Sequence, residues 1–128
     1  MPSERQREAA RILRLAQRDL KAARAMLDVD AFEEPTWGYH IQQSTEKALK
    51  AWISALEQPY PRTHDLALLC RLVSDYGGDP SPYASLGSFT GFGSRLRYEE
   101  DEEPLNLDRA TWNQLCTDLL AHVASLLP

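Results

Sequence analysis

Apolar side chains recur at helical spacing in four segments of the chain. Residues 3–28 contain no Gly or Pro, and a helix over this range puts apolar side chains on one side and cations on the other. The apolar positions are Ile12, Leu15, Ala16, Leu20, Ala23, Met26 and Leu27, and the cations are Arg7, Arg11, Arg14, Arg18 and Lys21. The pattern predicts an amphipathic helix.

Two further helices are bounded by residues that start or stop helices. Thr36 is the expected N-cap of a helix from Trp37 to about Leu56, whose core-facing positions are Trp37, Ile41, Ala48, Trp52 and Ala55. Two prolines then interrupt the helical pattern. Thr63 is the expected N-cap of a helix from His64 to Tyr76, which two glycines end.

The remainder of the chain contains an irregular part and a last helix. Residues 77–94 are rich in turn formers, and only a short helix around Tyr83 to Leu86 fits them. The run Glu99 to Glu103 is too acidic to bury and is expected to be a solvated loop. Asp108 is the expected N-cap of a last helix with apolar residues at Trp112, Leu115, Leu119, Val123 and Leu126. Since no alternating run predicts a strand, we expect an all-α fold: an antiparallel up-and-down bundle of four main helices, in one domain over residues 1–128.

Charge and composition narrow the classes of function. The net charge is −5, but residues 1–27 hold seven basic and three acidic groups, whereas residues 98–128 hold one basic and seven acidic groups. This acidity argues against a protein that coats nucleic acid nonspecifically.

No apolar run is long enough for a membrane span and the first residues are charged, so a cytoplasmic protein is expected. Cys70 and Cys116 lie far apart without a metal-binding spacing, so we expect reduced thiols, no metal and no cofactor.

The most informative polar residues lie on the second predicted helix. His40, Gln43, Lys47 and Lys50 are spaced by three, four and three residues, which places them within an arc of about 80°. Two ammonium groups, an imidazole and an amide on one face suit a phosphate group, and the pattern is also that of an ordinary solvated face.

Two shorter motifs add candidate residues. His64 and Asp65 are expected in the first turn of the third helix, where free backbone N–H groups favour an anion. Arg95, Arg97 and Tyr98 combine cations with an aromatic ring, as in nucleotide contacts, although the arginines have acidic neighbours with which to pair. Motifs of known catalytic sites, such as a phosphate-binding glycine loop, GxSxG or HExxH, do not occur.

Taken together, these motifs resemble the HEPN domain (higher eukaryotes and prokaryotes nucleotide-binding). The resemblance rests on YHIQQSTEKALKAW, then PRTHDL, then RYE, and covers about residues 5–126. It implies an up-and-down helical bundle, commonly dimeric, often encoded beside a minimal nucleotidyltransferase in two-component or toxin–antitoxin systems. The residues that match the family pattern are Gln42, Gln43, Glu46, Lys47, Lys50, Thr63, His64, Asp65, Arg97 and Tyr98.

The chain also departs from the family pattern. HEPN ribonucleases carry an Arg followed four to six residues later by His, and no Arg of this chain is followed by His at that distance. Glu99 replaces the family's usual proline after RY. We therefore expect a non-catalytic protein that binds a nucleotide or phosphorylated ligand; the alternatives are an RNA-cleaving toxin with an atypical site and a pure protein-interaction module.

Overall fold

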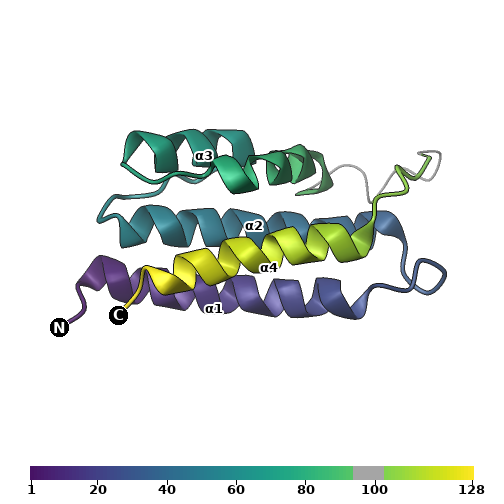
Figure 1. Ribbon diagram of the computed structural model, residues 1–128, viewed down its shortest axis with the longest axis horizontal. Coiled ribbons are helices and arrows are strands. Elements are labelled where there is room, and N and C mark those ends of the chain that lie inside the picture. Colours follow the sequence, from purple (N-terminus) through teal and green to yellow (C-terminus); the bar gives the residue numbers. More distant parts are fainter. Residues whose placement is uncertain (94–102) are drawn as a thin grey trace.

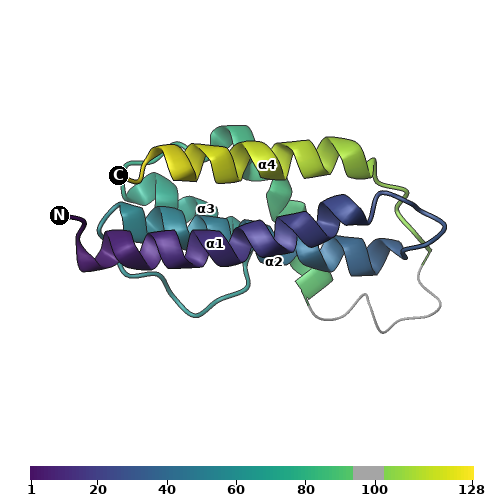
Figure 2. The ribbon, with the colours of Figure 1, turned by 90° about the horizontal axis from the view of Figure 1, so that it is seen from below.

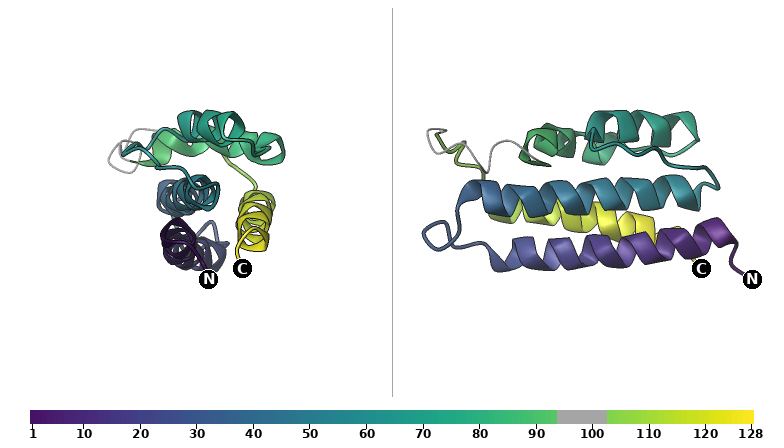
Figure 3. Two further views of the ribbon diagram at one scale, coloured as in Figure 1. Left: turned by 90° about the vertical axis from the view of Figure 1, so that its left-hand side faces the viewer. Right: turned by 180° about the vertical axis from the view of Figure 1, so that it is seen from behind.

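The computed structural model is all-helical over the residues that it describes, 1–93 and 103–128 (Figure 1). Three long helices, α1 (Glu4–Ala25), α2 (Glu34–Ala55) and α4 (Arg109–Ser125), lie side by side. A shorter helix, α3 (Leu66–Asp75), and a 3-10 helix, η1 (Ser81–Gly93), cover α2 on the side away from α1 (Figure 3). The predicted helical bundle is confirmed. In chain order, α3 and η1 together occupy the place between α2 and α4.

The helix α1 is amphipathic as predicted. The helices α2 and α4 pack against α1 and lie along it in both views (Figures 1 and 2). The five predicted cations are all exposed, and the residues buried on the opposite side are Ala9, Ile12, Leu13, Ala16, Leu20 and Ala23. Ser3 begins the helix with a capping box, because its hydroxyl accepts from the Gln6 N–H while Gln6 Oε1 accepts from the Ser3 N–H. The helix ends before Leu27, which is 51% exposed, so the predicted end was too late.

The helix α2 begins earlier than Thr36 predicts. Its N-cap is Glu33, and Pro35 lies within the first turn. Proline is well tolerated there because its missing N–H would have no helical partner and its φ suits a helix. The prediction was wrong because Pro35 was taken as a boundary. The Glu34 carboxylate accepts from the backbone N–H groups of Leu105 (2.7 Å) and Leu107 (2.8 Å), which ties the entry to α4 onto α2.

The helix α3 begins later than predicted, at Leu66. Asp65 is its N-cap and accepts from the Leu68 N–H at 3.2 Å. Thr63 Oγ1 instead accepts from the Asp65 N–H at 3.1 Å. Both Thr63 and Asp65 have side chains that can cap a helix, and Asp65, which is nearer the apolar run, is the N-cap. His64 therefore lies before the first turn and not inside it. The Asp108 cap of α4 is confirmed.

The segment expected to hold only a short helix forms the whole of η1. Three aromatic or aliphatic side chains, Leu86, Phe89 and Phe92, repeat every third residue and are all buried. A 3-10 helix has three residues per turn, so this spacing aligns them on one face. The ring of Phe92 packs on Gly38 of α2, where an added Cβ would lie 2.5 Å from Phe92 Cε1.

The core is centred on α2. Neighbouring elements cover most of its surface, and its largest fully buried side chains are Trp37, Trp52, Ile41, Leu49 and Ile53. Trp37 Nε1 donates to Asn113 Oδ1 at 2.8 Å, which satisfies both groups inside the bundle. Trp112 packs against the edge of the core. None of the helices in the described part of the chain is long and apolar enough to span a lipid bilayer.

Candidate functional site

Only one face of the central helix α2 is partly open to solvent. Because α1, α3, η1 and α4 pack around α2, most of its side chains are buried. The half-exposed residues over its middle and last turns include His40, Gln43, Lys47 and Lys50. The structure thus places these four predicted residues along one face, and the helix periodicity explains why.

Asp19 of α1 occupies the first half of this face. Its Oδ1 lies 3.1 Å from His40 Nδ1, and its Oδ2 lies 2.5 Å from Lys47 Nζ. The Asp19 side chain is only 15% exposed, which strengthens its interaction with Lys47 relative to a fully solvated pair. Lys47 is therefore neutralised by a carboxylate from the neighbouring helix.

Asp19 was missed in the sequence because no motif includes it. A signal was nevertheless present. On the helical pattern of α1, Asp19 falls between the apolar side and the cationic side, which is where a residue meets a neighbouring helix. An acidic residue at that boundary indicates a cationic partner across the interface.

Glu46 organises the second half of the face. Its carboxylate accepts from Lys50 Nζ at 3.0 Å and from Gln42 Nε2 at 3.0 Å. His64, from the turn before α3, places its Nδ1 2.8 Å from Glu46 Oε1. Gln43 joins this group because its Nε2 donates to Gln42 Oε1 at 2.7 Å. We call Gln42, Gln43, Glu46, Lys50 and His64 the Glu46 cluster.

The Glu46 carboxyl is held in its charged form. Burial raises its pKa, because the side chain is 7% exposed, but the hydrogen bonds from its three partners outweigh burial and bring the pKa below its ordinary value. A carboxylate fixed in this way holds the Lys50 ammonium and the His64 ring in defined positions. Lys50 also lies 6.0 Å from the centre of the Tyr60 ring.

His64 is the most exposed member of the cluster. Its side chain is 79% exposed, and only Nδ1 is directed to Glu46. The other ring nitrogen remains available to a ligand. Asp65, its neighbour in sequence, does not join the cluster, because its carboxylate caps α3. The two residues predicted as a pair therefore have different roles.

The remaining predicted site residues, Arg95, Arg97 and Tyr98, lie outside the described residues, as do Glu99 to Glu102 of the acidic run. Within residues 1–93 and 103–128, no group of three His, Cys, Asp or Glu side chains is arranged to hold a metal ion.

The α2 face contains two ammonium groups and two imidazoles, which two carboxylates position. Such an arrangement suits hydrogen bonding to an anion, or proton transfer at His64.

Comparison with known proteins identifies the family. No curated protein and no solved structure gives a significant match to the chain. A family model described as HEPN domain matches residues 9–116, which include all of α2, α3 and η1 with the Glu46 cluster. Because this match extends over most of the chain and the fold is helical throughout its described part, the protein belongs to the HEPN domain family.

Proposed function

We propose that this HEPN protein is non-catalytic and binds a nucleotide or another phosphorylated ligand at the half-exposed face of α2. The observation that carries the proposal is the convergence of Lys47, Lys50 and His64 on that face. We also propose that the protein is a homodimer and acts with a minimal nucleotidyltransferase in a two-component or toxin–antitoxin system, as the resemblance implies.

The carboxylates of Asp19 and Glu46 hold the lysine and histidine side chains in place, and N–H donors remain for an anion. Each ammonium group has three N–H donors, and Lys50 uses one of them on Glu46. Since Lys50 and His64 are already held by Glu46, a ligand phosphate meets side chains whose conformational freedom is reduced before binding.

Calorimetric titration with ATP and AMP tests this site. We expect Lys47→Gln and Lys50→Gln each to weaken binding by about fivefold or more, since a charged hydrogen bond is lost. Lys21→Gln is the matched control, because Lys21 is exposed on α1 and removes the same charge away from the α2 face. Circular dichroism establishes that each variant is folded. Equal effects of all three variants, or no saturable binding by the wild type, would refute the site.

The proposed partnership has a separate test. Analytical ultracentrifugation of the chain alone gives its oligomeric state, and mixing it with a purified minimal nucleotidyltransferase encoded nearby gives complex formation. We expect a dimer and a heteromeric complex. A monomer that forms no complex at about micromolar concentration would contradict this part of the proposal.

A second candidate function is RNA cleavage with His64 as the proton-transferring group. It is favoured by one observation, the 2.8 Å contact of Glu46 with Nδ1 of a ring that is otherwise exposed. A carboxylate that fixes the imidazole in this manner is a feature of general acid–base sites. Incubation with structured and unstructured RNA in the presence of a chelator would show cleavage that His64→Gln abolishes. Intact RNA across about pH 5 to 9 would exclude this function.

A further inference from the structure

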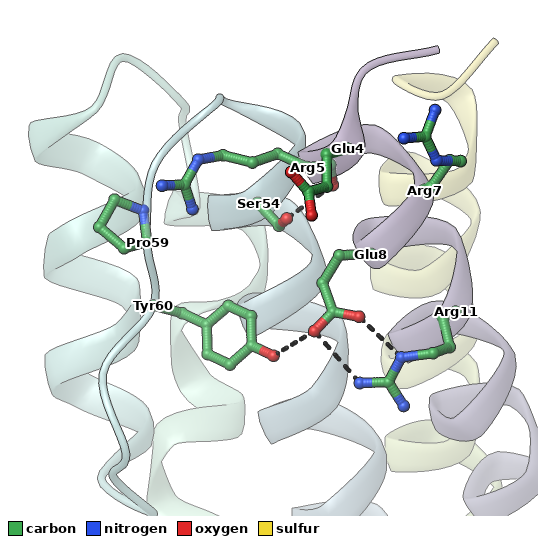
Figure 4. A pocket seen from close by; sticks show the side chains of 8 residues that line it. All are labelled: Glu4, Arg5, Arg7, Glu8, Arg11, Ser54, Pro59 and Tyr60. Atoms are coloured by element: carbon green, nitrogen blue, oxygen red, sulfur yellow. Dashed lines mark hydrogen bonds and ion pairs between the residues drawn. The ribbon is translucent and has the colours of Figure 1, made fainter.

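A groove separate from the α2 face lies between the first turns of α1 and the segment that follows α2 (Figure 4). Its volume is about 810 Å³, and it is open to solvent. The lining residues are Glu4, Arg5, Arg7, Glu8, Arg11, Ser54, Pro59 and Tyr60. None of them belongs to the site described above, and the sequence motifs include none of them.

Hydrogen bonds between distant parts of the sequence hold the groove open. Tyr60 Oη donates to Glu8 Oε2 at 2.8 Å, and Ser54 Oγ donates to the Arg5 carbonyl oxygen at 2.6 Å. A third hydrogen bond joins the same two segments, because Ser3 Oγ donates to Glu57 Oε1 at 2.6 Å. These contacts fix both walls, so a ligand would meet a preformed surface.

The groove contains guanidinium donors that the rest of the described chain does not use. Arg5 extends across the groove toward Pro59 (Figure 4), and its guanidinium has no hydrogen-bond or ion-pair partner in residues 1–93 and 103–128. Arg11 donates to Glu8 through Nε (2.7 Å) and one terminal nitrogen (3.2 Å), which leaves its other terminal nitrogen available. The exposed cations Arg14, Arg18 and Lys21 continue from the groove along α1.

We infer that this groove binds a short acidic peptide segment of a partner protein. Guanidinium groups recognise carboxylates through paired hydrogen bonds, and Arg5 and Arg11 offer unused donors. Between them, the ring of Tyr60 and Pro59 provide an apolar surface for a side chain of the peptide. The occupant therefore combines carboxylates with an apolar or aromatic residue.

The charge distribution favours a short acidic segment over a long polyanion. Glu4 and Glu8 belong to the wall of the groove and would repel a continuous phosphate backbone. A peptide can place its carboxylates at the arginines and leave polar N–H groups beside Glu4 and Glu8.

Fluorescence anisotropy with a labelled peptide of repeated Glu-Glu-Tyr tests the inference on the full chain. We expect saturable binding that Arg5→Gln weakens at least about fivefold, because a charge-assisted contact is lost. The guanidinium of Arg5 has no partner in the described structure, so this variant should fold normally. Arg71→Gln, on the exposed side of α3, removes the same charge elsewhere and should change the affinity less than about twofold. A Gln-Gln-Tyr peptide should not bind.

Three results would overturn the inference: no saturable binding, equal weakening by Arg5→Gln and Arg71→Gln, or preferential binding of a single-stranded RNA of equal charge through Arg5. Lys47→Gln separates this groove from the proposed nucleotide site. It should weaken ATP binding and leave peptide binding unchanged, so either site can fail without the other.

Discussion

Glu46 contributes both to the candidate site and to the stability of the fold. Its nearly buried carboxylate accepts hydrogen bonds from Lys50, His64 and Gln42. We expect Glu46→Gln to lower the free energy of unfolding at neutral pH by about 1–3 kcal/mol, because it removes a charged acceptor with several donors. Chemical denaturation of both proteins, followed by circular dichroism, measures this difference.

The pH dependence of the same variant gives an independent check. The folded-state pKa of Glu46 is lowered, so its contribution to stability is present above its unfolded pKa and disappears as the pH falls through the folded value. The wild type should therefore lose more stability than Glu46→Gln when the pH is lowered from about 5 to about 3. Parallel losses in the two proteins would show that the carboxylate is not specifically stabilised.

At the scale of the elements, η1 depends on three side chains that repeat every third residue. Phe89 is fully buried and packs edge-to-face against Trp37 (5.6 Å between ring centres) and Trp112 (4.9 Å). We expect Phe89→Ala to destabilise the protein by about 3–5 kcal/mol. Ala84→Ser, at an exposed position of the same element, is the control. A loss below about 1 kcal/mol, measured by denaturant titration, would show that η1 is only loosely attached.

The helices that the sequence predicts well are those whose apolar residues follow the α-helical period. The side of α1 that faces the core follows from that period alone, as does the α2 face that carries His40 and Lys47. Only a short part of η1, around Tyr83 to Leu86, was predicted, because its glycines and proline suppress an α-helical prediction. Its buried positions follow a three-residue period instead. Helix starts were misplaced at Pro35 and at Thr63, where two residues could each begin the helix.

The candidate site was only partly predictable for a related reason. The α-helical period places Lys47 and Lys50 on one face, but it does not reveal what lies opposite them. Their carboxylate partners are Asp19, from another helix, and Glu46, which the motif contains but whose bridging to His64 depends on the turn before α3. The groove at Arg5 and Tyr60 depends in the same way on contacts between distant segments.

At the scale of the whole molecule, the labelling rates of the two cysteines measure how often the bundle opens. Burial raises the pKa of both thiols; Cys116 is fully buried and Cys70 half-buried. Because the thiolate is the reactive form, we expect Cys70 to react slowly with a thiol reagent and Cys116 to react only when the bundle opens. Mass spectrometry of the labelled protein distinguishes the two sites. Equal rates for both cysteines in the folded protein would contradict this expectation.

The Glu34 carboxylate, which holds the backbone of Leu105 and Leu107, has a consequence for the order of folding. These contacts join residues 71 and 73 positions apart, so a long stretch of chain must be ordered before they form, whereas α1 and α2 are joined by a short connection. We expect the carboxylate to engage after the rate-limiting step. In stopped-flow experiments, Glu34→Ala should then accelerate unfolding and leave the refolding rate nearly unchanged. A slower refolding rate would instead place the docking of α4 within the folding nucleus.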